Sequence, residues 1–262
     1  MNISTEFFMY CKAHYSKMGF RRYQQGYSRI TNDVLQNFHF KKLSSGRECT
    51  VEFGVFPLCM VNLTPEMGVY DMLCFDENTY ADGMGWRYDK KSDESIIECI
   101  KKLCFHLDTD LIPFFEKADC CESALCELIH LDYLFDSVRL SSIQKFGGED
   151  RAEKIETRML RAPEKIYMAL KNGDFELAGK ALRLSIEKAE SICSNEIFCL
   201  ETAAFSNKAA LERRIERRNA QINQFKFLLS QVEQKNVSYI RSYLEQNERS
   251  SKEQLEAFFT TR

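Results

Sequence analysis

The sequence is poor in the residues that interrupt regular structure: its 262 residues include only 4 prolines, 11 glycines and one tryptophan. This scarcity excludes collagen-like and proline-rich chains, while 44% hydrophobic and 29% charged residues exclude a disordered one. No stretch approaches the roughly 20 uncharged apolar residues that span a bilayer. The first twelve residues carry Glu6 and lack a basic region, so they do not resemble a secretory signal.

The sequence also lacks an excess of charge and a disulfide framework. Its formal net charge is only −3, and its 11 cysteines are odd in number and irregularly spaced. Such cysteines are typical of buried thiols in a reducing compartment. We therefore expect a cytoplasmic protein with no membrane partner, and the charge balance argues against nucleic acid as a partner.

Charge and glycine content divide the chain into two parts. Residues 1–150 hold 16 basic and 23 acidic side chains, whereas residues 151–262 hold 20 and 16, and nine of the glycines lie before residue 149. Because glycine marks turns and bulges, the first part should be mixed and the second helical. The predicted domains are an α+β domain over residues 1–145 and a helical domain over residues 146–262, with a hinge at residues 145–150.

Apolar periodicity gives the predicted elements of the first domain. An amphipathic helix over residues 4–18 is followed by short segments that alternate apolar and polar residues, the clearest at residues 34–42 and 50–56. Connections this short favour antiparallel pairing. Further helices are predicted from residue 92 and after residue 119. The predicted fold class is α+β, an antiparallel β-meander with covering helices followed by an all-α hairpin or bundle.

Several short segments carry a resemblance to a known family. They are Phe7-Phe8, the run Tyr15-Ser16-Lys17-Met18-Gly19-Phe20-Arg21-Arg22, Tyr27-Ser28-Arg29, Phe53-Gly54-Val55, Trp86 and Ile112-Pro113-Phe114-Phe115. In these the first half of the chain resembles the bacterial family catalogued as domain of unknown function 4304. The resemblance implies an opening helix followed by strands, and it implies no particular activity.

The second part contains two helical patterns. Gly173 and Asp174 lie between two amphipathic segments, as the end of one helix and the cap of the next, so this region resembles one tetratricopeptide-type hairpin. A heptad-spaced stripe then runs from Leu211 to Tyr243 and gives a candidate association seam. Packing of this seam within one chain is favoured over a homodimer, and both remain open. The seam residues are Leu211, Ile215, Ile222, Phe225, Leu229 and Val232.

Catalytic and cofactor motifs are missing. The sequence contains no phosphate-binding glycine loop and no nucleophile elbow, so no catalytic residue and no cofactor is assigned. The one metal-like grouping is Cys121, Cys126 and His130, which lacks the tight ligand pairs of structural zinc sites, and buried thiols are the favoured interpretation. No metal is predicted.

Two weaker patterns are kept as candidates. A pocket between sheet and helices would be lined by Arg29, Phe38, His39, Trp86 and Tyr88, and a basic patch on the sheet would contain Arg21, Arg22, Lys41 and Lys42. The favoured function is a non-enzymatic protein–protein interaction module, with an immunity-like or regulatory partner of a basic protein as a special case. The alternatives are a small-ligand binder or enzyme using that pocket, and a weak single-stranded nucleic-acid binder using that patch.

Overall fold

The computed structural model describes residues 1–43, 46–65, 67–68, 70–75, 85–144, 163–202 and 208–260. The chain forms two compact units. The sheet unit comprises residues Met1–Gly148 and Asn247–Arg262, and the helical unit comprises Glu149–Gln246. The α+β fold class is confirmed. The last sixteen residues, however, group with the sheet, whereas the sequence had placed them in the helical domain; the predicted hinge at 145–150 lies outside the described residues.

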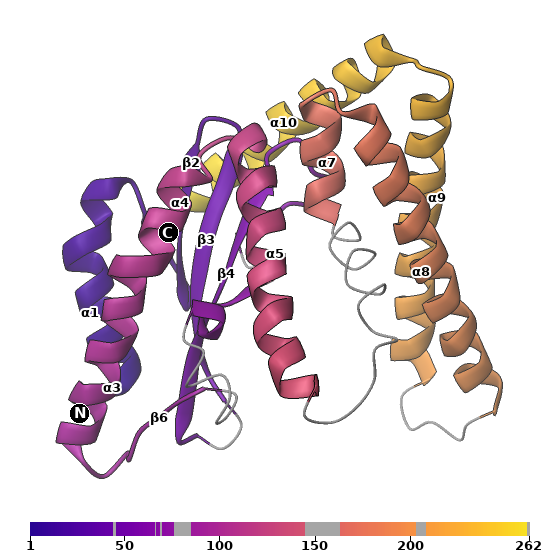
Figure 1. The fold of residues 1–262 in the computed structure, drawn as a ribbon. Coiled ribbons are helices and arrows are strands. Elements are labelled where there is room, and N and C mark those ends of the chain that lie inside the picture. The colour runs from indigo at the N-terminus through magenta and orange to yellow at the C-terminus, as the bar shows by residue number, and fades with distance from the viewer. Residues whose placement is uncertain are drawn as a thin grey trace. The chain divides into compact units, whose positions relative to one another are not determined.

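The sheet unit is built on an antiparallel sheet in the order β1-β2-β3-β4-β5, with β6 also paired to β4 (Figure 1). The predicted segment at residues 34–42 is β3, the segment at residues 50–56 lies within β4, and the turn at Gln24 joins β1 and β2 in a hairpin. The strands are β1 (Arg21–Tyr23), β2 (Gly26–Thr31), β3 (Val34–Lys42), β4 (Glu48–Pro57), β5 (Tyr70–Asp71) and β6 (Trp86–Arg87).

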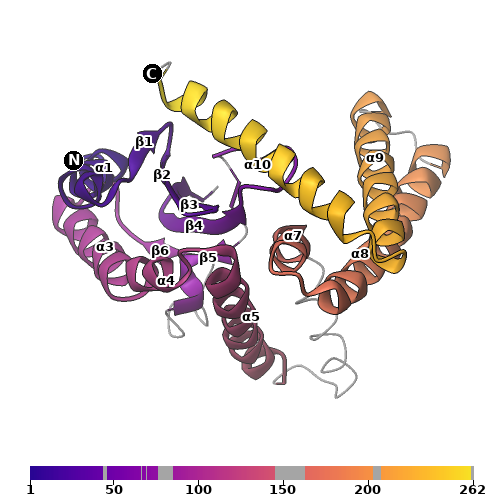
Figure 2. The same ribbon diagram turned by 90° about the horizontal axis from the view of Figure 1, so that it is seen from above.

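Helices cover one face of this sheet (Figure 2). On that face Phe38 packs against Tyr15, Phe20 and Tyr27, with ring centroids 5.5–6.0 Å apart. These rings are all almost completely buried, so the predicted alternation of β3 is confirmed and its apolar face forms the core. The covering segments are α1 (Ile3–Tyr15), the 3₁₀ turn Ser16–Met18, α3 (Asp93–His106), the π-helical turn Leu107–Leu111 and α4 (Ile112–Lys117).

The C-terminal half of α10 (Val237–Thr260) lies on the other face of the sheet (Figure 2). The Phe258 ring packs against Tyr23 at 4.9 Å, and the Ser251 hydroxyl donates to the carbonyl of Met60. Leu255 is only 1% exposed. A segment far away in the sequence therefore closes the second side of the sheet. The sheet unit is completed by the 3₁₀ turn Met72–Phe75 and α5 (Cys121–Gln144).

Close packing on this second face depends on Gly26. A Cβ atom added at Gly26 would lie 2.3 Å from His39 Nδ1 and 2.6 Å from the carbonyl oxygen of Phe38. Gly26 and His39 are directly paired across β2 and β3. Because Gly26 has no side chain, the imidazole of His39 has room to pack against the backbone of β2.

The helical unit contains α7 (Pro163–Lys171), α8 (Phe175–Thr202), α9 (Lys208–Glu233) and the first part of α10. Gly173, with φ 77°, ends α7, and the Asp174 carboxylate accepts a hydrogen bond from the backbone of Leu177, as the hairpin pattern predicts. Lys235 takes the same left-handed conformation, with φ 53°, and ends α9. The stripe from Leu211 to Tyr243 therefore belongs to two helices and not to one. No helix in the described segments has the length and apolar character needed to cross a membrane.

Candidate functional site

The predicted pocket does not assemble, because its residues lie on opposite faces of the sheet. Arg29 pairs with Gln36, which places it on the same face as Phe38, whereas His39 pairs with Gly26 and Glu52 on the other face. Neighbouring residues of a strand point to opposite sides, so Phe38 and His39 cannot line one cavity. The pocket interpretation is wrong for these three residues.

Arg29 and His39 have structural surroundings instead. The Arg29 Nε donates to the side-chain oxygen of Gln36 at 2.7 Å, and its guanidinium lies 4.5 Å from the centre of the Phe20 ring. Burial lowers the pKa of Arg29, partly offset by the charges of Glu116 and Asp119. Burial likewise lowers the pKa of His39. A half-buried arginine that already contacts the sheet and a ring is suited to fixing the fold more than to binding a ligand.

Trp86 and Tyr88 lie at the edge of the sheet. Trp86 is paired with Cys49 in β4, and Tyr88 contributes to an open recess of about 730 Å³. The recess is lined mainly by charged side chains, and Arg87 is paired with Glu48 at 3.1 Å. This hollow will be called the edge recess. It is lined by Arg47, Glu48, Arg87, Tyr88, Asp89, Lys91 and Ser95.

The predicted basic patch is also divided between the two faces. The Arg22 guanidinium lies over the Phe8 ring, whereas Arg21 lies over the ring of Phe259 on the opposite side. Lys41 and Lys42 are adjacent residues of β3 and therefore also point apart, and Lys41 forms an ion pair with Glu52. These cations do not form one surface, so the nucleic-acid alternative loses its predicted site.

The metal-like grouping is dispersed on α5. Cys121 is buried, and its backbone amide donates to Asp33, whereas Cys126 and His130 are exposed. Within the part of the chain that the structure describes, no group of three possible metal ligands lies together. The three residues therefore give no metal centre.

The π-helical turn gathers polar contacts that the sequence did not predict. Asp108 accepts hydrogen bonds from the hydroxyls of Tyr10 and Tyr15, and His106 Nδ1 lies 2.7 Å from Asp110. Burial, followed by the hydrogen bond to Asp108, raises the pKa of Tyr15. A π-turn widens the helix just before Pro113, which has no N–H to donate. The hydrogen bonds to Asp108 tie α1 to the π-helical turn. The spacing of four residues was a sequence signal only for the contact between His106 and Asp110.

The helical unit carries an apolar groove. Two adjoining hollows of about 430 and 240 Å³ share Phe175, Val237 and Ile240. The turns at Gly173 and Lys235 begin the helices that hold these residues, α8 and α10. This surface, which will be called the helical groove, is lined by Leu170, Lys171, Gly173, Phe175, Glu176, Gly179, Arg183, Val232, Glu233, Lys235, Val237, Ile240, Arg241, Leu244 and Glu245.

The predicted association seam lies on α9, which packs along α8 within the chain. Ile222 and Phe225 are buried, whereas Leu211, Ile215, Leu229 and Val232 are half-buried. The seam is therefore used, at least in part, inside the molecule, as the favoured interpretation holds. The homodimer stays a prediction.

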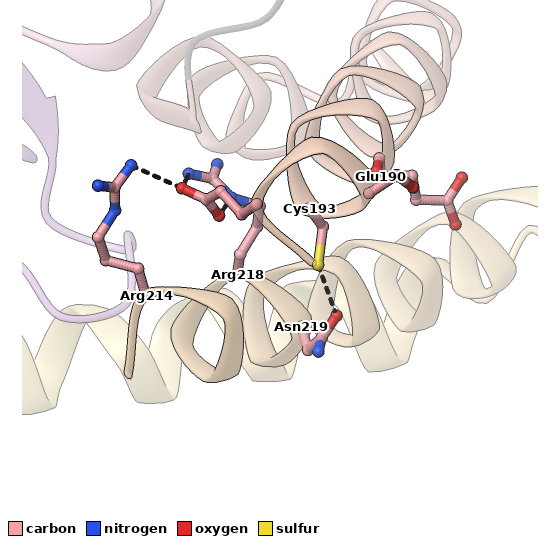
Figure 3. A network of polar contacts seen from close by, with 7 residues as sticks. Glu190, Cys193, Arg214, Arg218 and Asn219 are labelled. Carbon is pink, nitrogen blue, oxygen red and sulfur yellow. Dashed lines mark hydrogen bonds and ion pairs between the residues drawn. The ribbon is translucent and has the colours of Figure 1, made fainter. Parts of the chain in front are cut away.

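A row of polar contacts runs between α8 and α9 (Figure 3). Glu190 pairs with Lys226 at 2.6 Å, and Cys193 Sγ lies 3.3 Å from Asn219 Oδ1. One turn further along α8, Glu196 accepts from Arg218 at 3.0 Å and from Arg214 at 2.6 Å. Two of the four arginines between residues 213 and 218 thus bind an acid on the neighbouring helix.

Glu196 should stabilise the helical unit in a pH-dependent manner. The hydrogen bond from Arg218, with the charges of Arg218 and Arg214, lowers the pKa of Glu196. Because the folded pKa is depressed, its contribution is present above the ordinary glutamate value of about 4.3 and is lost as the pH falls through the lower folded value.

We expect Glu196→Gln to lower the free energy of unfolding by about 1–2 kcal/mol at pH 7. The difference from the unaltered protein should disappear at acid pH, because a protonated glutamate resembles glutamine. Urea unfolding followed by far-UV circular dichroism measures both effects. Glu187→Gln, at an exposed position of α8, is the control, and a loss that stays constant down to acid pH would refute the role assigned to the charge.

Comparison with known proteins adds no relative: the chain matches no family model, no curated protein and no solved structure. The resemblance to the family of unknown function 4304 therefore stays a prediction, as does the tetratricopeptide-type hairpin. The helical groove is the candidate site that the geometry supports best.

Proposed function

We propose that the protein is a cytoplasmic interaction module whose helical groove binds an amphipathic segment of a partner protein. The observation that carries this proposal is the apolar floor shared by two adjoining hollows. Val237, which lines both, remains 39% exposed. Apolar surface of this kind, hollowed and open to solvent, marks interaction sites more often than inert surface.

The charges at the groove indicate what the partner presents. Both signs occur around it, and Arg183 neutralises Glu233 across a 2.9 Å ion pair. The other charged side chains of the groove are three basic and two acidic ones, an excess of a single positive charge, so no strong field of one sign surrounds the apolar floor. A partner that inserts apolar side chains from one face of a helix fits this surface, as in other helix-in-groove complexes. The strongly basic partner suggested by the charge asymmetry of the sequence fits it less well.

Val237→Asp tests the groove without weakening the helix that carries it. Val237 is the first residue of α10, where a carboxylate interacts favourably with the helix dipole. The charge would nevertheless lie at the centre of the apolar floor. Random peptides displayed on phage can be selected on the full chain, and the affinity of the selected peptides can be measured by fluorescence anisotropy. We expect Val237→Asp to weaken their binding at least about tenfold, or about 1.4 kcal/mol.

Ser238→Asp is the matched control. It adds the same charge one residue along, at an exposed position that does not line either hollow, and should leave the affinity unchanged. Selected peptides should also carry apolar residues at helical spacing. Peptides that bind both variants equally, or a selection that yields no binding peptide, would contradict the proposed function.

A further inference from the structure

Two buried thiols meet between the sheet and α3. Cys49 lies in β4, Cys99 lies in α3, and their sulfur atoms are 3.6 Å apart. The two residues are 0% and 3% exposed. A disulfide needs an S–S distance of about 2.05 Å, so the sulfurs have to approach by about 1.5 Å, a change that small side-chain rotations can supply.

The two thiols are not equivalent. The hydrogen bond between them raises the pKa of Cys49 and lowers the pKa of Cys99, so Cys99 is the member that more readily carries the negative charge. The charge of Lys102 also lowers the pKa of Cys99, whereas burial and the charge of Glu98 raise it without reversing the net direction. Since the thiolate is the nucleophile in thiol–disulfide exchange, Cys99 is suited to react first and Cys49 to react second.

The edge recess gives a reagent a way towards this pair. Glu48, which lines the recess, directly precedes Cys49 in β4, and Ser95, which also lines it, lies one helical turn before Cys99 in α3. Arg47, Arg87 and Lys91 outnumber the two acids of the recess, Glu48 and Asp89. The recess therefore favours an anionic reagent over a cationic one.

We propose that Cys49 and Cys99 are a redox-active dithiol, closed to a disulfide by an anionic low-molecular-weight disulfide that enters at the edge recess. The Cys99 thiolate attacks one sulfur of the small disulfide, forming a mixed disulfide and releasing the other half as a thiolate, which takes up the proton lost by Cys99. Cys49 then loses its proton and attacks the Cys99 sulfur, releasing the second small thiol. Two cysteine thiols are oxidised by two electrons, and one small disulfide is reduced to two thiols. Such bonds in a reducing cytoplasm are transient and regulatory, so this pair would be a switch.

The test uses the reduced form of the 262-residue chain and glutathione disulfide, which carries a net negative charge. After the reaction, free thiols are blocked and the protein is digested without reduction for mass spectrometry. We expect one peptide pair linked through Cys49 and Cys99, and we expect it from the folded protein but not from protein held in urea. Cystamine, a cationic disulfide, should react several-fold more slowly at low ionic strength.

Three variants keep the result interpretable. Cys99→Ser and Cys49→Ser should each abolish the linked peptide pair. If Cys49→Ser does not fold, Cys99→Ser alone provides this test. Cys104→Ser, at another buried position of α3, should leave the pair intact. The proposal is overturned if Cys49 and Cys99 stay separately alkylated under conditions in which the exposed Cys126 and Cys199 react, or if Cys121 is linked to Cys59 instead. Equal rates with the two reagents would overturn the role of the edge recess.

Discussion

Gln36→Leu is expected to destabilise the sheet unit by about 3–5 kcal/mol, because it removes polar contacts that cannot be replaced by water. Gln36 is fully buried, and its amide nitrogen donates to the backbone carbonyls of Phe115 and Ala118. Its oxygen accepts from Arg29. Leucine keeps most of the volume but leaves both carbonyls without this donor and the half-buried guanidinium without this acceptor.

The fluorescence of Trp86 measures this effect selectively. Trp86 is the only tryptophan of the chain, is 3% exposed and belongs to the sheet unit, so its urea transition follows that unit. Gln25→Leu, at an exposed position in the β1–β2 turn, makes the same chemical change in solvent and should alter stability by less than about 0.5 kcal/mol. An equally small effect of Gln36→Leu would show that these hydrogen bonds do not hold α4 to the sheet.

Leu255→Asp is expected to have an equally large effect on the sheet unit, although residue 255 lies in the part of the sequence predicted to be helical. Leu255 is 1% exposed on the portion of α10 that belongs with the sheet. Burying an unpaired carboxylate there is costly, so the variant should lose about 4 kcal/mol or more, or release this helix from the sheet. In both cases the Trp86 transition moves to lower urea concentration.

Gln254→Asp is the control for Leu255→Asp, since it places the same carboxylate on the same helix at an exposed position. The comparison also distinguishes the two divisions of the chain. If residues 247–260 belonged to a separate helical domain, Leu255→Asp would change the far-UV signal of the helices and leave the Trp86 transition in place. That outcome would reject the discontinuous sheet unit.

Local patterns in the sequence predict much of the sheet unit. The alternation of β3 is visible in its second half, where the apolar Phe38 and Phe40 alternate with the polar His39 and Lys41. The same rule could have excluded the predicted pocket, since Phe38 and His39 are adjacent in that strand. It could equally have separated Arg21 from Arg22 and Lys41 from Lys42.

Other features carry no local signal. The turn at Lys235 uses a left-handed conformation without glycine or asparagine at that residue, so the apolar stripe continues across it as if one helix were present. The apolar face of α10 predicts that another part of the protein covers it. It does not predict contacts with residues as distant as Met60, 191 positions from Ser251. The helical groove is likewise formed by residues from α7, α8, α9 and α10, and a pattern within any one of these helices cannot reveal it.

The use of residues 247–260 to close the sheet has a consequence for synthesis of the chain. Strands β1 to β4 leave the ribosome early, but the helix that covers their second face follows only after the roughly one hundred residues of the helical unit. At about 5–20 residues per second, synthesis of the helical unit alone takes on the order of 5–20 s. During that time the second face of the nascent sheet is uncovered, including its apolar residues Tyr23, Leu35 and Phe56. Ribosome stalling within the helical unit should therefore yield chains that depend on chaperones to stay in solution.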